Sequence, residues 1–292
     1  MENTRTKTTR NSLILLLTAA IWGMAFVSQS KGMDYMHPFT FNGVRSLIGA
    51  ASILVYILIS RKIAGDKAAP LDWKLNVKAG LLCGIFLTIA STLQQFGIKY
   101  TSVGKAGFIT TLYIIFVPMF GIFLKKKVAP VVWAAAVMAA VGMYLLCMTE
   151  SLRLGAGDIM VFLCAIAFAI QIMTVDHYAA RIDGAVVSCI QFTVCGVVCC
   201  IGALIWGQPT FGQLQEGLGA LLYAGVLSCG VGYTLQIVGQ KGLNPTVAAL
   251  IMSLESVISA IAGWLVLGQH LSGREIAGCV MMFAAIILAQ LP

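Results

Sequence analysis

Charge-free hydrophobic segments recur along the whole chain of 292 residues. Asn11–Ser30, Ala79–Ile98, Ala106–Leu124 and Val128–Thr149 contain no Lys, Arg, Asp or Glu. About 20 apolar residues in an α-helix cross the hydrocarbon core of a bilayer. With 59% hydrophobic and 10% charged residues, the composition leaves little chain for a water-soluble domain. We therefore predict an all-α integral membrane protein. Its ten predicted transmembrane helices are 12–30, 41–60, 78–98, 104–124, 129–148, 157–176, 185–206, 217–239, 245–267 and 273–291.

The basic residues sort by the loops between these predicted helices. Of the nineteen Lys and Arg residues, thirteen fall on the side that includes the N-terminus, five fall on the other side, and Arg45 lies within a helix. Cytoplasmic loops carry such an excess of basic residues. We therefore expect both termini in the cytoplasm and a multi-pass protein of the cell's cytoplasmic membrane. Because the charge does not cluster on one folded face, the net charge of +8 does not indicate a nucleic-acid partner.

A shift of 142 residues aligns two parts of the chain without a gap. It superimposes "LQQFGIKYTSVGKAGFITTLYIIFVPMFG" on "LQIVGQKGLNPTVAALIMSLESVISAIAG". Residues 1–150 and 151–292 are thus predicted to be two five-helix repeats. An odd number of crossings forces the second repeat to enter the membrane inverted, and inverted repeats around a midplane site are typical of secondary transporters.

Four segments carry a family resemblance: "AAIWGMAFVSQSKGM", "PFTFNGVRSLIGA", "LQQFGIKYTSVGKAGFITTLYIIFVP" and "SLESVISAIAGWLVLGQHLSGREIAG". With these, the chain resembles the drug/metabolite transporter superfamily, specifically its EamA-like ten-helix branch. The resemblance implies a secondary carrier, often an exporter, of small metabolites such as amino acids or of drug-like compounds. The sequence departs from the family where Glu commonly follows a Leu-Gly pair, since Gln269 and Lys126 or Lys127 stand there.

Glu255 lies near the middle of the predicted span 245–267. An ionised residue at a helix centre costs about 2.5–3.5 kcal/mol on insertion scales, which marks it as a candidate for function. We expect a protonated carboxyl in a dry cavity and an ionised one when the cavity is wet or holds a cation. Such a group could couple proton movement to transport. The alternatives are a hydrogen bond between helices by protonated Glu255, or a pair with Arg45.

Arg45 belongs to a polar or small stripe on the second predicted helix. The stripe consists of Asn42, Arg45, Gly49, Ser52 and Tyr56. A guanidinium offers planar donors that could hold a substrate carboxylate. It could equally bind backbone carbonyls and lock helices together, or extend to the membrane interface. The resemblance implies that an Arg is usual here and leaves its role open.

Other polar and aromatic residues in both repeats complete the predicted cavity. They are Trp22, Gln94, Gln95, Tyr113, Gln171, Tyr233, Gln236 and Ser259. Gln94 pairs with Gln236, and Tyr113 with Glu255, under the shift of 142 residues. We therefore expect each pair to lie across the central cavity. A phenol, a carboxyl and amides suit zwitterions or polar metabolites.

The function that these features favour is secondary active transport of small polar or amphipathic metabolites by alternating access, with protons as a candidate coupling ion. A passive facilitator of the same substrates and a polytopic membrane enzyme are the alternatives. No phosphate-binding loop, metal-ligand motif or Ser-His-Asp spacing occurs, so no cofactor or metal is expected and ATP-driven pumping by this chain alone is excluded. The expected partners are a small-molecule substrate and the lipid bilayer. The oligomeric state is left open.

Overall fold

The computed structural model describes residues 2–65, 70–101, 103–124, 128–147, 155–258, 261 and 272–289. Its regular elements in these ranges are all helices, as predicted. Those of the first half are α1 (Glu2–Tyr35), α2 (Pro38–Ala64), α3 (Trp73–Tyr100), α4 (Val103–Thr111), α5 (Tyr113–Phe123) and α6 (Pro130–Cys147). Those of the second half are α7 (Ala156–Tyr178), α8 (Gly184–Gly202), η2 (Ala203–Gly207), α9 (Phe211–Glu216), α10 (Leu218–Leu222), η3 (Tyr223–Gly232), α11 (Tyr233–Gly239), α12 (Pro245–Met252) and α14 (Gly273–Ala289).

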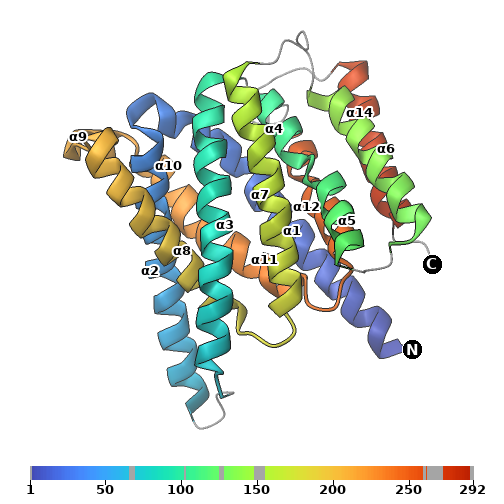
Figure 1. Cartoon of the computed structure of the whole chain (residues 1–292), viewed down its shortest axis with the longest axis horizontal. Coiled ribbons are helices and arrows are strands. Elements are labelled where there is room, and N and C mark those ends of the chain that lie inside the picture. The colour runs from blue at the N-terminus through green and yellow to red at the C-terminus, as the bar shows by residue number, and fades with distance from the viewer. Residues whose placement is uncertain are drawn as a thin grey trace.

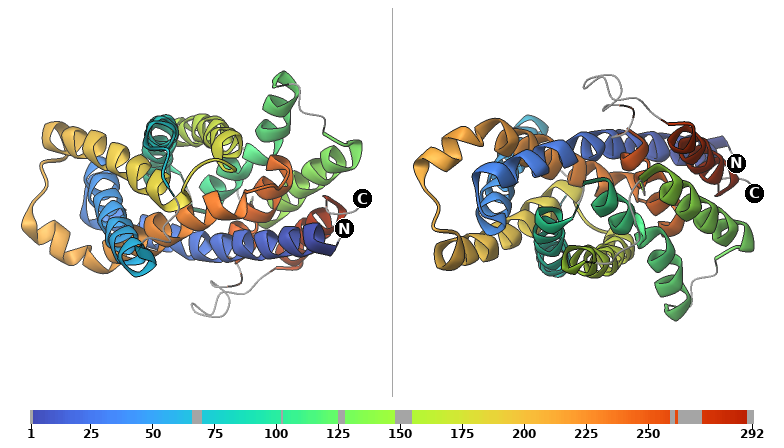
Figure 2. Two further views of the ribbon diagram at one scale, coloured as in Figure 1. Left: turned by 90° about the horizontal axis from the view of Figure 1, so that it is seen from below. Right: turned by 90° about the horizontal axis from the view of Figure 1, so that it is seen from above.

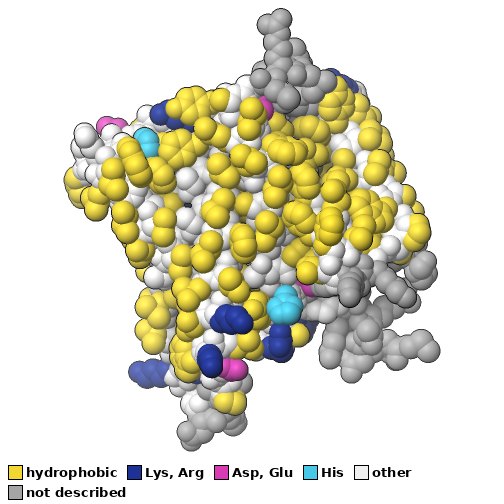
Figure 3. All heavy atoms as spheres, viewed as in Figure 1, with side chains coloured by type: hydrophobic (Ala, Val, Ile, Leu, Met, Phe, Trp, Pro, Cys, Tyr) yellow, Lys and Arg dark blue, Asp and Glu magenta, His cyan; other side chains and the backbone are white. Residues whose placement is uncertain are grey.

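Seven helical segments within the described ranges are long and apolar enough to cross a membrane. They are Thr8–Tyr35, Pro38–Ala64, Trp73–Tyr100, Ala106–Phe123, Ala156–Tyr178, Gly184–Gly207 and Leu218–Gly239. Pro130–Leu146 and Pro245–Ile258 are shorter apolar helices, and part of the predicted span 245–267 lies outside the described ranges. Hydrophobic side chains cover the flank in Figure 3, and charged side chains gather toward its two ends. This surface suits a bilayer.

Capping residues explain where several helices begin. Pro38 and Pro245 occupy the first turns of α2 and α12, where the missing N–H of proline costs nothing. The side chains of His37 and Asn244 accept hydrogen bonds from the backbone N–H two residues on. At the start of α8, Asp183 caps the helix in the same way. These signals fix the starts of three helices.

The helices of the two halves interlock. Helix α2 packs along α8, and α6 packs along α14, which Figure 1 shows as two neighbouring pairs. Helix α3 packs along α7, and α1 packs along α11 and η3. The further views in Figure 2 show the two halves intermixed. Elements from both halves therefore surround the middle of the molecule.

Glycines bring α3 and α8 close together. An ideal Cβ on Gly80 would lie 2.6 Å from Ile190 Cβ, and one on Gly84 would lie 2.9 Å from Val194 Cβ. A larger residue at either position would force the helices apart. The Gly80-x-x-x-Gly84 pattern thus serves as a close-packing motif, as is common between membrane helices.

Two helices are interrupted at corresponding points in the two halves. Helix α4 ends before Leu112, and α12 ends before Ser253 and Leu254. Leu112 N donates to Ile109 O and Leu254 N to Ile251 O, both at 3.2 Å. The hydroxyls of Thr111 and Ser253 bond back to carbonyls of the preceding turn, a geometry that bends helices. The predicted spans 104–124 and 245–267 are therefore not continuous helices.

Candidate functional site

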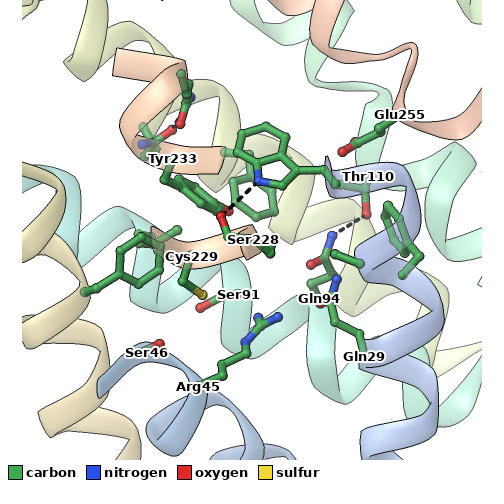
Figure 4. Close-up of a pocket in the computed structure, with 18 of the residues that line it drawn as sticks. Gln29, Arg45, Ser46, Ser91, Gln94, Thr110, Ser228, Cys229, Tyr233 and Glu255 are labelled. Atoms are coloured by element: carbon green, nitrogen blue, oxygen red, sulfur yellow. Dashed lines mark hydrogen bonds between the residues drawn. The ribbon is translucent and has the colours of Figure 1, made fainter. Parts of the chain in front are cut away.

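A cavity of about 50 Å³ lies in the middle of the molecule. Its walls come from α1, α2, α3, α4, α5, α7, α8, η3, α11 and the helical residues 255–258. At about 10–15 Å³ for each water, it has room for a few water molecules. Figure 4 shows polar side chains converging on it from several helices.

Tyr113 and Glu255 directly follow the two helix interruptions, and both line this cavity. Tyr113 is the first residue of α5, and Glu255 directly follows the break after α12. Both side chains are buried, with exposed fractions of 4% and 5%. Among the described residues, the phenol oxygen of Tyr113 makes no hydrogen bond of good geometry. Both members of this pair, which the shift of 142 residues relates, therefore line one cavity.

Amide side chains from both halves line the cavity and bond to neighbours. Gln94 Nε2 donates to Thr110 Oγ1 at 3.2 Å. Gln236 Nε2 donates to Gln171 Oε1 at 3.2 Å, and Gln171 Nε2 lies 3.5 Å from Gln191 Oε1. Carboxamides can donate and accept, so this wall offers neutral partners for a polar ligand.

Aromatic rings form another wall. The centroids of Trp22 and Tyr233 are 4.6 Å apart, and Phe192 meets Tyr233 edge to face at 5.0 Å. The indole Nε1 of Trp22 donates to Ser228 O at 3.4 Å, as the dashed line in Figure 4 marks. Rings held in this way present an apolar surface beside the polar groups.

Arg45 projects from α2 into the cavity. It is 6% exposed, and it lines the cavity between the helices. Within the part of the chain that the structure describes, its guanidinium makes no hydrogen bond to a carbonyl, and its Nε is buried without an acceptor. Its contact is with the ring of Phe41, whose centroid lies 5.2 Å from Cζ. Among the described residues, Arg45 thus shows neither a bond to a backbone carbonyl nor an ion pair with Glu255, the two alternatives that the sequence left open.

Eight of the residues expected in the cavity from the sequence line it. They are Trp22, Arg45, Gln94, Tyr113, Gln171, Tyr233, Gln236 and Glu255. The adjacent Gln95 does not, because it is fully buried and its Nε2 donates to Gln29 O at 3.2 Å. Ser259 lies outside the described residues.

Further lining residues were not among the sequence candidates. They include Gln29, Ser46, Ser91, Thr110, Phe168, Phe192, Ser228 and Cys229. The position of Thr110 could have been inferred, since it lies three residues before Tyr113 within the predicted span 104–124. The small hydroxyls carry no distinguishing sequence signal, because Ser and Thr occur at many positions in these helices. Among the described residues, no group of three or more His, Cys, Asp or Glu side chains could hold a metal ion.

A second and larger cleft, of about 610 Å³, opens at one end of the molecule. Its walls are the end of α2, the start of α3, the turn between α7 and α8, and α11. It is lined by Arg61, Arg181 and Lys241 together with Asp72 and Asp183. It shares no lining residue with the central cavity. On the predicted topology this is the cytoplasmic end.

A helical membrane protein whose two halves enclose a polar cavity beside interrupted helices has the general design of a solute transporter. The chain matches the profile of the EamA-like transporter family over residues 10–148 and again over 155–291. The protein therefore belongs to the EamA-like transporter family.

Relatives support this assignment. An uncharacterized transporter of Archaeoglobus fulgidus is 27% identical, with 95% of this chain and 84% of the relative aligned. The uncharacterized transporter YwfM of Bacillus subtilis is 26% identical, with 96% and 94% aligned. A solved crystal structure of a protein aligns with a TM-score of 0.79 at 16% identity and covers 97% of this chain and 96% of its own. That likeness shows the fold.

Proposed function

We propose that this protein is a secondary active transporter that exports small polar or amphipathic metabolites, such as amino acids, across the cytoplasmic membrane. The observation that carries the proposal is a cavity with one buried carboxyl and one buried guanidinium at the meeting point of two interrupted helices. Discontinuous helices at a midplane site are typical of carriers built from repeats. Membership of a transporter family supports it.

The proposed architecture has ten membrane helices in two inverted repeats, residues 1–150 and 151–292, with both termini in the cytoplasm. Two features support it. The interruptions at Leu112 and Leu254 are 142 residues apart, as are the back-bonding hydroxyls of Thr111 and Ser253. The packing of α3 on α7 corresponds to that of α11 and η3 on α1. Rocking one repeat against the other would expose the cavity to each side in turn.

Proton coupling through Glu255 is the second part of the proposal. The carboxyl is buried beside Tyr113 and makes no ion pair with Arg45 in the described structure. A buried carboxyl favours its neutral form and ionises when water or a cation enters. Release of its proton on one side and uptake on the other would tie substrate movement to the proton gradient. In the rival passive facilitator, Glu255 would only contact the substrate.

The test is transport of a panel of labelled amino acids, amines and nucleosides in proteoliposomes, with and without a pH gradient. Parent protein should accumulate a substrate against its gradient, and Glu255→Gln should abolish the dependence on pH while folding normally. Glu216→Gln is the matched control, since this carboxylate is exposed on α9. Unchanged pH dependence in Glu255→Gln would overturn coupling, whereas downhill movement alone in the parent would favour the facilitator.

A further inference from the structure

We infer that Arg45 is the carboxylate-binding group of the central cavity, so that the transported metabolite bears a carboxylate, and that zwitterions fit best. This inference rests on the proposed transport function and specifies its substrate class. Its starting point is a buried positive charge without a counter-charge.

Buried guanidinium groups are normally paired and hydrogen-bonded, because an unpaired buried charge is strongly disfavoured. Arg45 breaks this rule. It is 6% exposed, its Nε lacks an acceptor, and its contact is the aromatic face of Phe41. Among the described residues, this guanidinium is buried and directed into a cavity while its Nε lacks an acceptor, so its anionic partner would come from outside the protein. A ligand anion meets that requirement.

The surroundings of Arg45 favour an anion over a cation. Figure 4 shows Ser46, Ser91, Gln94 and Cys229 around the guanidinium. Hydroxyl and amide groups can donate hydrogen bonds to a carboxylate. Glu255, the one carboxyl among the described residues that line the cavity, lies away from Arg45 on the far side of the pocket in Figure 4. No acidic side chain among the lining residues therefore competes with a ligand carboxylate at Arg45.

The separation of Arg45 and Glu255 explains the preference for zwitterions. The planar guanidinium binds a carboxylate through two parallel hydrogen bonds. A ligand ammonium could then reach ionised Glu255, and the faces of Trp22 and Tyr233 would contact its apolar part. A ligand with both charges satisfies both buried groups, whereas a simple amine would leave Arg45 unpaired.

Matched ligands that differ in one group test this inference. The probes are L-leucine, its amide, isoamylamine and 4-methylpentanoate, extended to other L-amino acids with their amides and to inorganic phosphate. Binding to purified protein in detergent is followed by thermal shift. Parent protein should bind the free amino acid about 10–100-fold more tightly than its amide, in line with a charge-assisted pair. Arg45→Gln should remove that preference.

Two variants sharpen the comparison. Arg45→Lys keeps the charge and loses the planar pair of donors, so it should retain part of the preference. Arg181→Gln removes a charge from an exposed position outside the central cavity and should bind as the parent does. Equal binding of acid and amide by the parent, tighter binding of phosphate than of any carboxylate, or a preference that survives in Arg45→Gln would overturn the inference.

The melting temperature of the protein without ligand tests the role of Arg45 independently of which probes bind. Because Arg45 Nε has no hydrogen-bond partner among the described residues and its contact is with the ring of Phe41, unliganded Arg45→Gln should melt at or above the temperature of the parent. A clear fall would identify a structural anchor and contradict the inference. The transport proposal fails separately, when proteoliposomes move none of the compounds. In that case an acid-over-amide preference that depends on Arg45 would still identify the anion-binding group.

Discussion

At the scale of single residues, some buried polar atoms that line the proposed binding cavity lack hydrogen-bond partners among the described residues. Besides Arg45 Nε, the phenol oxygen of Tyr113 is buried with no hydrogen-bond partner in the described structure. Most buried polar atoms in proteins are paired. Twelve buried side-chain atoms among the described residues lack a partner. Four of them, on Gln29, Arg45, Tyr113 and Gln236, line the cavity that also contains Glu255, so the proposed site has unfilled hydrogen-bonding capacity.

Tyr113→Phe should separate stability from function at this position. Removal of a hydroxyl that is buried and unpaired should leave the free energy of unfolding within about 1 kcal/mol of the parent or raise it. If the hydroxyl donates to Glu255 during transport, the pH profile of transport should shift in the variant. Thermal melts and proteoliposome assays measure the two effects. A fall in melting temperature comparable to that of a core truncation would contradict this view.

Adjacent residues show how far the site could be predicted from the sequence. Helical spacing and the repeat predicted that Gln94 and Gln236 line one cavity. Spacing and repeat can both be recognised within a single sequence, so this part of the site was predictable. The same reasoning could not separate Gln94 from Gln95, which are neighbours on α3. That helix packs against α7 on one side and α8 on another, so more than one of its faces is buried. Which amide meets the cavity depends on helix packing that no local pattern specifies.

At the scale of secondary structure elements, the start of α2 contains a titratable cap outside the membrane-spanning segments. His37 Nδ1 lies 3.4 Å from Phe39 N and accepts its hydrogen bond. Partial burial, and secondarily the charge of Lys99, lower the pKa of His37 below its ordinary value of 6.5. The folded protein thus favours neutral imidazole, the form that can accept the capping bond.

The sign of the resulting pH dependence follows from linkage. Because the folded pKa lies below the unfolded one, the contribution of His37 to stability is present above about pH 6.5 and is lost as the pH falls through the folded pKa. Melting temperature should therefore fall from pH 7 to pH 5 in the parent. His37→Asn keeps a capping side chain that does not titrate and should reduce that fall. His177→Asn is the control, and an equal reduction in it would refute the assignment.

The interrupted helices mark the limit of prediction at this scale. Thr111 and Ser253 lie in hydrophobic runs that suggest unbroken spans. Thr174 makes the same kind of back-bond, to Ile170 O at 2.8 Å, yet α7 continues through it. A hydroxyl in a helix therefore does not signal a break. The break depends on the packing around it, whereas the helices themselves were predictable from composition.

At the scale of the whole molecule, two loops far apart in sequence meet at one end. Arg61 at the end of α2 and Arg181 after α7 line the same cleft. Gln208, which follows η2, lies at the opposite end of α8 from Asp183. The positive-inside rule assigns the end with the cleft to the cytoplasm. The orientation of the molecule in the membrane can thus be tested with one residue at each end.

Single cysteines in a background that lacks the nine native ones make this test. Gln208→Cys should react with a membrane-impermeant maleimide in intact cells, whereas Arg181→Cys and Arg61→Cys should react only after the cells are permeabilised. The topology would be reversed if the two arginine positions reacted first. Labelling at both ends in intact cells would indicate leaky cells, which a cytoplasmic marker protein reveals.

The small size of the central cavity has a physiological consequence. At about 50 Å³, it accommodates a few water molecules, and a metabolite as large as leucine requires it to widen. A central cavity of this volume between packed helices gives ions no wide aqueous path across the bilayer. Many idle copies could then remain in a membrane without draining its electrical potential, so the cell could keep the protein constantly available at little energetic cost.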